Sequence, residues 1–198
     1  RGAHPRYIRT ALQQGPTSLE LVGEKRWATL APSADALVVI ASRGERDGIN
    51  QLVPVVVPTD RHGISMNDLE APGLSPEIRH AVLTLDHVPV RATDVLEVDG
   101  YRDAVRPFRT FEDLYIAAAL EACTLRHGIE HGWPDELLED LLGQLLAMHA
   151  LAQENLRTPL AHIGLAALSR RDKELAPAKH AQWQRSPLGE RWVPRGET

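Results

Sequence analysis

Residues 23–41 carry the sequence Gly23-Glu24-Lys25-Arg26-Trp27-Ala28-Thr29-Leu30-Ala31-Pro32-Ser33-Ala34-Asp35-Ala36-Leu37-Val38-Val39-Ile40-Ala41. This stretch predicts a turn, a short polar and aromatic strand, a second turn and a fully apolar strand. Because side chains two residues apart on a strand share a face, Trp27 and Thr29 should present an indole and a hydroxyl on the same side. The pair can therefore contact one flat ligand.

The same pattern extends on both sides of this stretch, from about residue 17 to residue 98. Short β-type runs alternate there with turn residues, and no long helical pattern intervenes. Pro54 and Pro58 place one run at a sheet edge or bulge, because proline cannot donate to a ladder. The predicted strands are 19–22, 26–30, 36–41, 50–58, 64–70 and 80–90. Short connections of this kind predict an antiparallel β-barrel or sandwich.

The second half of the sequence is helical in pattern. Thr110 has the position of a helix cap, Gly128 that of a helix stop, and Pro134 and Thr158-Pro159 those of two further helix starts. A short fourth helix is predicted over 178–185. The fold class is therefore α+β, with a β-domain over 17–98, a helical bundle over 99–185 and a loose tail over 186–198.

Composition excludes several classes of protein. The chain has 198 residues, a net charge of -5 and one cysteine, Cys123. The negative charge argues against nucleic acid as a partner, and a single cysteine excludes an internal disulfide framework. No apolar run is long enough for a membrane span and no signal-peptide pattern opens the chain, so we expect a cytoplasmic protein.

The order of the β-type motifs resembles the acyl-CoA dehydrogenase family. In the family's middle domain, Gly-Glu-Lys-x-aromatic-(Ile/Val)-(Thr/Ser) leads into an Ala-Asp-hydrophobic strand, as at residues 23–41. Residues 81–96 resemble its Val-x-Val-Pro strand and exit loop, and residues 106–114 its entry into the C-terminal bundle. The resemblance covers about residues 19–192. The family's N-terminal helical domain, its Thr-Glu-x-Gly-x-Gly-Ser-Asp segment and its Arg-x-x-Phe-Gly run are not found.

The resemblance implies an FAD flavoprotein of fatty acid metabolism, an oxidoreductase that performs α,β-dehydrogenation of an acyl-CoA or acyl-carrier thioester. It places Trp27 beside the flavin ring and Thr29 near flavin N5, and it aligns Glu112 with the catalytic base of some members. Arg109 is a candidate for binding phosphate of FAD or coenzyme A. A homo-oligomer is expected, or a partner chain that supplies the N-terminal domain.

Simpler interpretations of these residues stay open. Glu112 can be a first-turn acid favoured by the helix dipole, and Arg109 a solvated surface arginine. Trp27 and Thr29 can be ordinary strand residues. The whole chain can be a truncated, non-catalytic relative that serves as an assembly or acyl-binding module.

Two histidines raise the question of a metal ion. His127 and His131 have the i, i+4 spacing of helical metal ligands, but the glycines nearby predict a loop and no third ligand is evident. The sequence therefore predicts no metal site.

Overall fold

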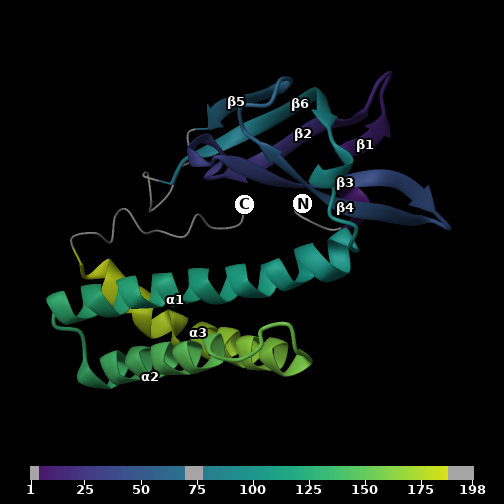
Figure 1. Cartoon of the computed structure of the whole chain (residues 1–198). Helices are drawn as coiled ribbons and strands as arrows, with labels where there is room; N and C mark the ends of the chain where they lie inside the picture. Colours follow the sequence, from purple (N-terminus) through teal and green to yellow (C-terminus); the bar gives the residue numbers. More distant parts are fainter. Residues whose placement is uncertain (1–4, 70–77, 187–198) are drawn as a thin grey trace. The chain divides into compact units, whose positions relative to one another are not determined.

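The computed structural model describes residues 5–69 and 78–186 (Figure 1). The chain divides into two compact units, Arg1–Arg106 and Pro107–Thr198, and each has its own hydrophobic core. The predicted domain ranges 17–98 and 99–185 stay a prediction, because compactness alone does not show that a unit folds independently. The predicted tail lies outside the described residues, except for Ser186.

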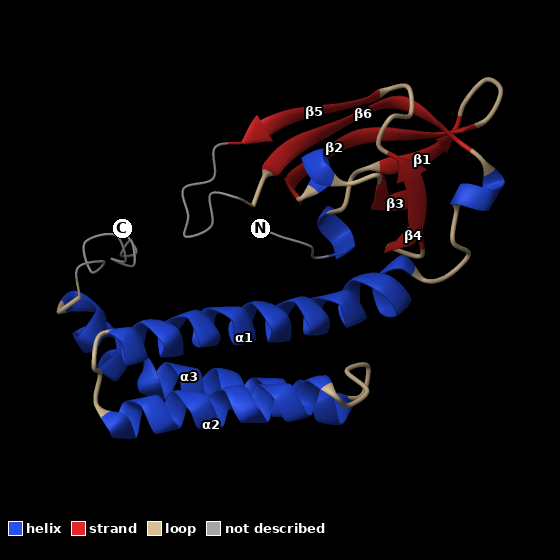
Figure 2. Cartoon of the chain, turned by 60° about the vertical axis from the view of Figure 1, so that its left-hand side comes forward, coloured by secondary structure: helices blue, strands red, loops and turns tan. Residues whose placement is uncertain are grey.

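The first unit is a six-stranded, mixed sheet, drawn in red in Figure 2. Its strands follow the order β4-β3-β1-β2-β6-β5 across the described sheet. Four pairings are antiparallel, whereas β1 and β3 meet in parallel at Ala11 and Ser42. The strands are β1 (Ala11–Gln14), β2 (Leu19–Thr29), β3 (Ala36–Arg46), β4 (Ile49–Pro58), β5 (Ile64–Leu69) and β6 (His80–Val90).

Sequence patterns explain where several strands lie. In β6, Ala81, Leu83 and Leu85 are buried and alternate with residues that are more exposed, as the period of two predicts. β4 lies at one edge of the sheet, which agrees with its two prolines. The apolar faces of the strands meet in one core that includes Leu21, Val55 and Val88.

One predicted turn is wrong. The turn expected after residue 22 does not form, because β2 continues through Gly23 with a φ of 138° and a shift in its register against β6. A side chain at this position would lie 3.0 Å from the Thr10 Cα atom. Glycine therefore allows a bulged strand to pass close to its neighbour, instead of reversing the chain.

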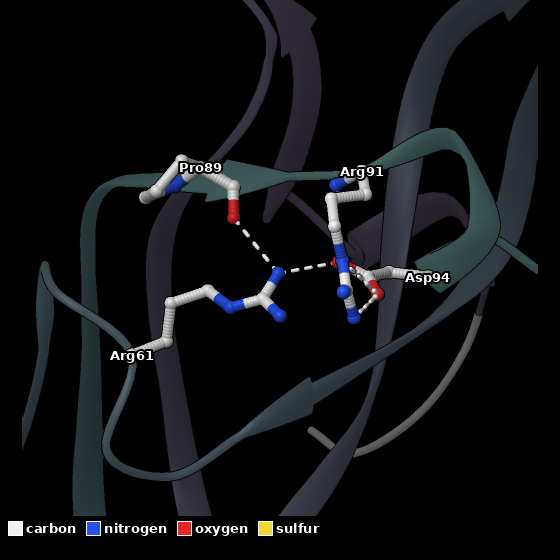
Figure 3. Close-up of polar contacts among 4 residues, drawn as sticks. All are labelled: Arg61, Pro89, Arg91 and Asp94. Carbon is white, nitrogen blue, oxygen red and sulfur yellow. Dashed lines mark hydrogen bonds and ion pairs between the residues drawn. The ribbon is translucent and has the colours of Figure 1, made fainter.

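Polar contacts around Asp94 hold the end of β6 to the turn between β4 and β5 (Figure 3). Arg61 donates to the Asp94 carboxylate and, at 3.1 Å, to the Pro89 carbonyl oxygen. Arg91 donates to the same carboxylate, from Nη2 to Oδ1 at 2.7 Å and from its backbone N–H to Oδ2 at 3.0 Å. Hydrogen bonds from Arg91 and Arg61 hold the pKa of the buried Asp94 carboxyl well below its usual range.

The second unit contains three helices within the described residues. They are α1 (Arg106–Glu130), α2 (Asp135–Ala152) and α3 (Pro159–Gln184). Thr158 caps α3 as predicted, because its hydroxyl accepts the Ala161 N–H at 3.3 Å. One apolar cluster joins Trp133, Leu141, Leu175 and Trp183, and a second contains Leu114 and Met148.

Three predicted helix boundaries are wrong. A π-helical turn, Gly100–Val105, leads directly into α1, so Thr110 lies inside the helix and is buried instead of capping it. Gly128 does not end α1, which runs to Glu130. The short fourth helix expected at 178–185 belongs to α3, which continues through Pro177. The predicted α+β class, with strands first and helices after them, is confirmed.

Candidate functional site

An open cleft of about 840 Å³ lies within the β unit. Its walls include residues from β2 and β3, among them Trp27, Thr29 and Val38. Trp27 is 56% exposed, and Thr29 is exposed as well. The two side chains that the sequence placed on one side of a strand therefore line one cleft and are accessible from it.

His80, the first residue of β6, contacts both side chains. Its ring meets the Trp27 ring edge to face, with centroids 5.7 Å apart and planes at 88°. Its Nδ1 atom lies 3.0 Å from the Thr29 hydroxyl oxygen. If the His80 Nδ1 atom carries the proton, Thr29 accepts from His80 and keeps its own hydroxyl proton for a ligand. In the other tautomer, the Thr29 hydroxyl donates its proton to His80 Nδ1.

Sequence reasoning missed His80. It lies 51 positions after Thr29 in the chain, and only the antiparallel register between β2 and β6 places the two residues opposite each other. Directly opposed side chains on neighbouring strands lie close enough to interact. The available signal was the strand start predicted at residue 80, but the spacing of residues along one strand does not determine its register against another.

Lys25 supplies a cation to the same cleft. Its Nζ atom donates to the Ile40 carbonyl oxygen at 2.8 Å, which joins β2 to β3. No carboxylate forms an ion pair with it among the described residues. Burial lowers the pKa of Lys25 to about 8.

The lowered pKa of Lys25 predicts a rise in stability with pH. Between about pH 8 and 10.5 the unfolded chain binds more protons at this residue than the folded chain, so the free energy of unfolding increases with pH there. The gain from pH 8 to pH 10 is about 2 kcal/mol. Urea unfolding of the wild type and Lys25→Met at both pH values should show this gain in the wild type alone. Equal gains in both proteins would contradict it.

The other two predicted site residues lie on α1, in the helical unit. The Arg109 guanidinium pairs with Asp113 at 3.0 Å and lies 4.0 Å from the Glu112 carboxylate. The Arg109 and Glu112 side chains are 67% and 38% exposed. Because α1 begins at Arg106, Glu112 lies beyond the first turn, and its interpretation as a first-turn acid is wrong. The roles of Glu112 as base and Arg109 as phosphate ligand stay predictions.

None of the helices in the described parts of the chain combines the length and the apolar character needed to cross a bilayer.

Comparison with known proteins identifies the fold. No family model and no curated protein sequence matches the chain. Among solved structures, butyryl-CoA dehydrogenase from Megasphaera elsdenii matches with a TM-score of 0.71 and 14% identity, over 96% of this chain and 56% of that one. Glutaryl-CoA dehydrogenase from Mycobacterium smegmatis, solved in complex with FADH2, matches with a TM-score of 0.62 and 20% identity, over 98% of this chain and 55% of that one.

A nitrososynthase from Micromonospora carbonacea var. africana also matches, with a TM-score of 0.67 and 22% identity, over 88% of this chain and 52% of that one. The chain thus spans about half the length of the solved structures that it matches. At these identities the likeness concerns the fold, which many functions can share. The chain has the fold of the acyl-CoA dehydrogenases over that half of their length.

Proposed function

We propose that the chain is part of an FAD-dependent oxidoreductase that dehydrogenates an acyl thioester between its α- and β-carbons. The observation that supports this most directly is the open cleft with Trp27 and Thr29 on its wall, in a chain with the acyl-CoA dehydrogenase fold. Its volume of about 840 Å³ lies within the range of roughly 300–1,000 Å³ common for ligand pockets.

The residues of the cleft have the chemistry that a flavin ring requires. Trp27 offers an exposed aromatic surface for a planar ring, and Thr29 offers a hydroxyl whose hydrogen-bond partner is His80. Lys25 adds a positive charge at the wall of the same cleft. When bound, FAD supplies the acceptor for the hydride that leaves the substrate's β-carbon. This chain's part is to orient the ring, exclude water from one face of it and fix one hydrogen bond.

In this proposal Glu112 takes the proton from the substrate's α-carbon, so that two C–H bonds break and one C=C bond forms. Arg109 now pairs with Asp113, and it would exchange that partner for a phosphate of FAD or coenzyme A. A second copy of the chain, or a partner that carries further parts of the fold, would complete the site.

The proposal predicts that Trp27 is needed for FAD binding. The purified chain should quench the fluorescence of added FAD, and Trp27→Ala should weaken binding about two- to tenfold, because an aromatic stacking contact is worth roughly 0.5–1.5 kcal/mol. Ile49→Ala is the control, because Ile49 is a similarly exposed apolar residue of the same sheet that lines neither the cleft nor the other pockets of the described residues. This variant should bind FAD like the wild type. An equal effect of both substitutions, or no binding by the wild type, would refute an FAD site formed by this chain.

An acyl-binding module without catalysis is the second candidate. The observation in its favour is a groove of about 860 Å³ within the helical unit, whose mainly apolar walls include Ile116, Leu120 and Leu168. Such walls suit a hydrocarbon chain whether or not a flavin is present. A protein that binds a fluorescent fatty acyl thioester but fails the FAD titration would favour the module over the enzyme.

A further inference from the structure

The end of α1 is a Schellman motif, which fixes the backbone around two histidines. The Trp133 N–H donates to the Gly128 carbonyl oxygen at 2.9 Å, and the Gly132 N–H donates to the Ile129 carbonyl oxygen at 3.4 Å. Gly132 has a φ of 63°, as this type of helix end requires. His131 is therefore the residue that caps the helix; the loop predicted for this segment begins only after Glu130, because residues 127–130 belong to α1.

Because the helix continues to this point, three potential metal ligands gather on one side of its last turn. The donor atoms of His127, Glu130 and His131 all lie within 4.8 Å of one another. Two histidines at i and i+4 on a helix are a common pair of zinc ligands, and the carboxylate between them supplies the third donor that the sequence interpretation lacked.

The two histidines differ in burial. His127 is buried, stacked at 4.2 Å on the Trp183 ring and met edge-on by Trp133. Its Nε2 atom has no hydrogen-bond partner among the described residues. His131 is exposed and also stacks on His127, with ring centroids 3.9 Å apart. His131 can therefore turn to bring its nitrogen to the common point, whereas His127 is already held.

Two further features favour a cation here. The Nδ1 atom of His131 lies 2.9 Å from the His127 carbonyl oxygen; when it donates this hydrogen bond, the lone pair remains on Nε2, as in many metal-ligating histidines. The C-terminal end of a helix also carries the negative end of its dipole, which stabilises positive charge. Within the described parts of the chain, Glu130 forms a single loose ion pair, with Arg126 at 3.9 Å, so its carboxylate can exchange partners.

We propose that His127, Glu130 and His131 bind a divalent transition-metal ion such as Zn²⁺ at the end of α1. Two imidazoles and one carboxylate form the nitrogen and oxygen donor set that such ions take, and they leave a fourth position to water. Tetrahedral ligands lie roughly 3.4 Å apart, so the three donors close on the ion by side-chain rotation without a change in the backbone. Because all three ligands lie at the end of α1, the ion would fix the last turn of this helix.

The test is a Zn²⁺ titration of the full chain by calorimetry, with Co²⁺ absorption to report the coordination geometry. We expect one bound ion, a tetrahedral Co²⁺ spectrum and a higher midpoint of thermal unfolding with Zn²⁺, since a ligand of the folded state stabilises it. His131→Ala should weaken binding more than tenfold, because loss of even an outer-shell group costs roughly 10–100-fold. Glu130→Gln should weaken it as well and change the Co²⁺ spectrum.

His180→Ala is the control, because His180 is an exposed histidine of α3 outside the three-residue cluster. It should leave Zn²⁺ affinity unchanged. The two substituted residues, His131 and Glu130, are exposed, so both variants should fold, and circular dichroism checks this. If His131→Ala unfolds, Glu130→Gln still tests the site. Equal affinity of the wild type and both ligand variants, or a Co²⁺ spectrum of the hydrated ion alone, would overturn the proposal.

Discussion

Lys179→Met should lower the free energy of unfolding of the helical unit by about 3–5 kcal/mol, the usual cost of removing one partner from a buried ion pair. The Lys179 Nζ atom lies 2.6 Å from Glu121 on α1 and 2.5 Å from Asp172 on α3. The Glu121 side chain is only 4% exposed, and its Oε1 atom has no hydrogen-bond partner among the described residues. Without Lys179, a buried carboxylate would lose the hydrogen bond that its Oε2 atom accepts. Urea unfolding followed by circular dichroism at 222 nm measures the loss.

A double variant separates the unpaired charge from lost packing. In Glu121→Leu with Lys179→Met, apolar side chains replace both partners, and the desolvation cost of the carboxylate disappears. Most of the stability lost in the single variant should therefore return. A double variant as unstable as Lys179→Met alone would show that the lysine stem, and not the charge, is what matters at this position.

The same variant should show a distinctive dependence on pH. Burial raises the pKa of Glu121, and Lys179 opposes that rise in the wild type. Removing the lysine leaves burial unopposed, so the folded variant binds a proton more readily than its unfolded chain. The destabilisation should consequently be smallest near pH 5 and grow as pH rises toward 8. A constant difference over this range would contradict the explanation.

Most of the strands and helices were predictable because local rules determine them, but strand β1 (Ala11–Gln14) was not predicted from the sequence. Alternating burial in β6 and the prolines of β4 follow from backbone geometry, which sequence spacing reflects directly. The course of β2 through Gly23 was not predictable in this way. Glycine suits both a turn and a bulge, and the close approach of Thr10 that selects the bulge involves a distant segment of the chain.

The same distinction applies to the candidate site. Trp27 and Thr29 were found because they are two residues apart on one strand, whereas His80 joins them only through the register of β6. At the end of α1, glycines at 128 and 132 were interpreted as a loop. Gly128 instead allows Trp133 and Leu138 to pack against the helix, since a Cβ atom there would lie 2.7 Å from Leu138. Of these two glycines, only Gly132 has a backbone conformation that favours glycine.

Asp94→Asn should destabilise the β unit by about 3 kcal/mol, although the substitution keeps the shape of the side chain. The carboxylate is 5% exposed and accepts hydrogen bonds from both Arg61 and Arg91. An amide in its place presents N–H groups to guanidinium donors and leaves the largely buried Arg61 without its counter-charge. Asp68→Asn is the matched control, because Asp68 pairs with Arg79 at 2.6 Å where both side chains are half exposed. It should cost less than about 1 kcal/mol.

The pH dependence of this effect follows from the lowered pKa of Asp94. Its contribution to stability is fully present above the ordinary pKa of an aspartate, about 4, and is lost as pH falls toward the lower pKa of the folded state. The difference between wild type and Asp94→Asn in urea unfolding should therefore be constant from pH 5 to 8 and shrink in stronger acid. If the difference instead vanished above pH 5, the contacts of Figure 3 would not be what holds the β4–β5 turn to the end of β6.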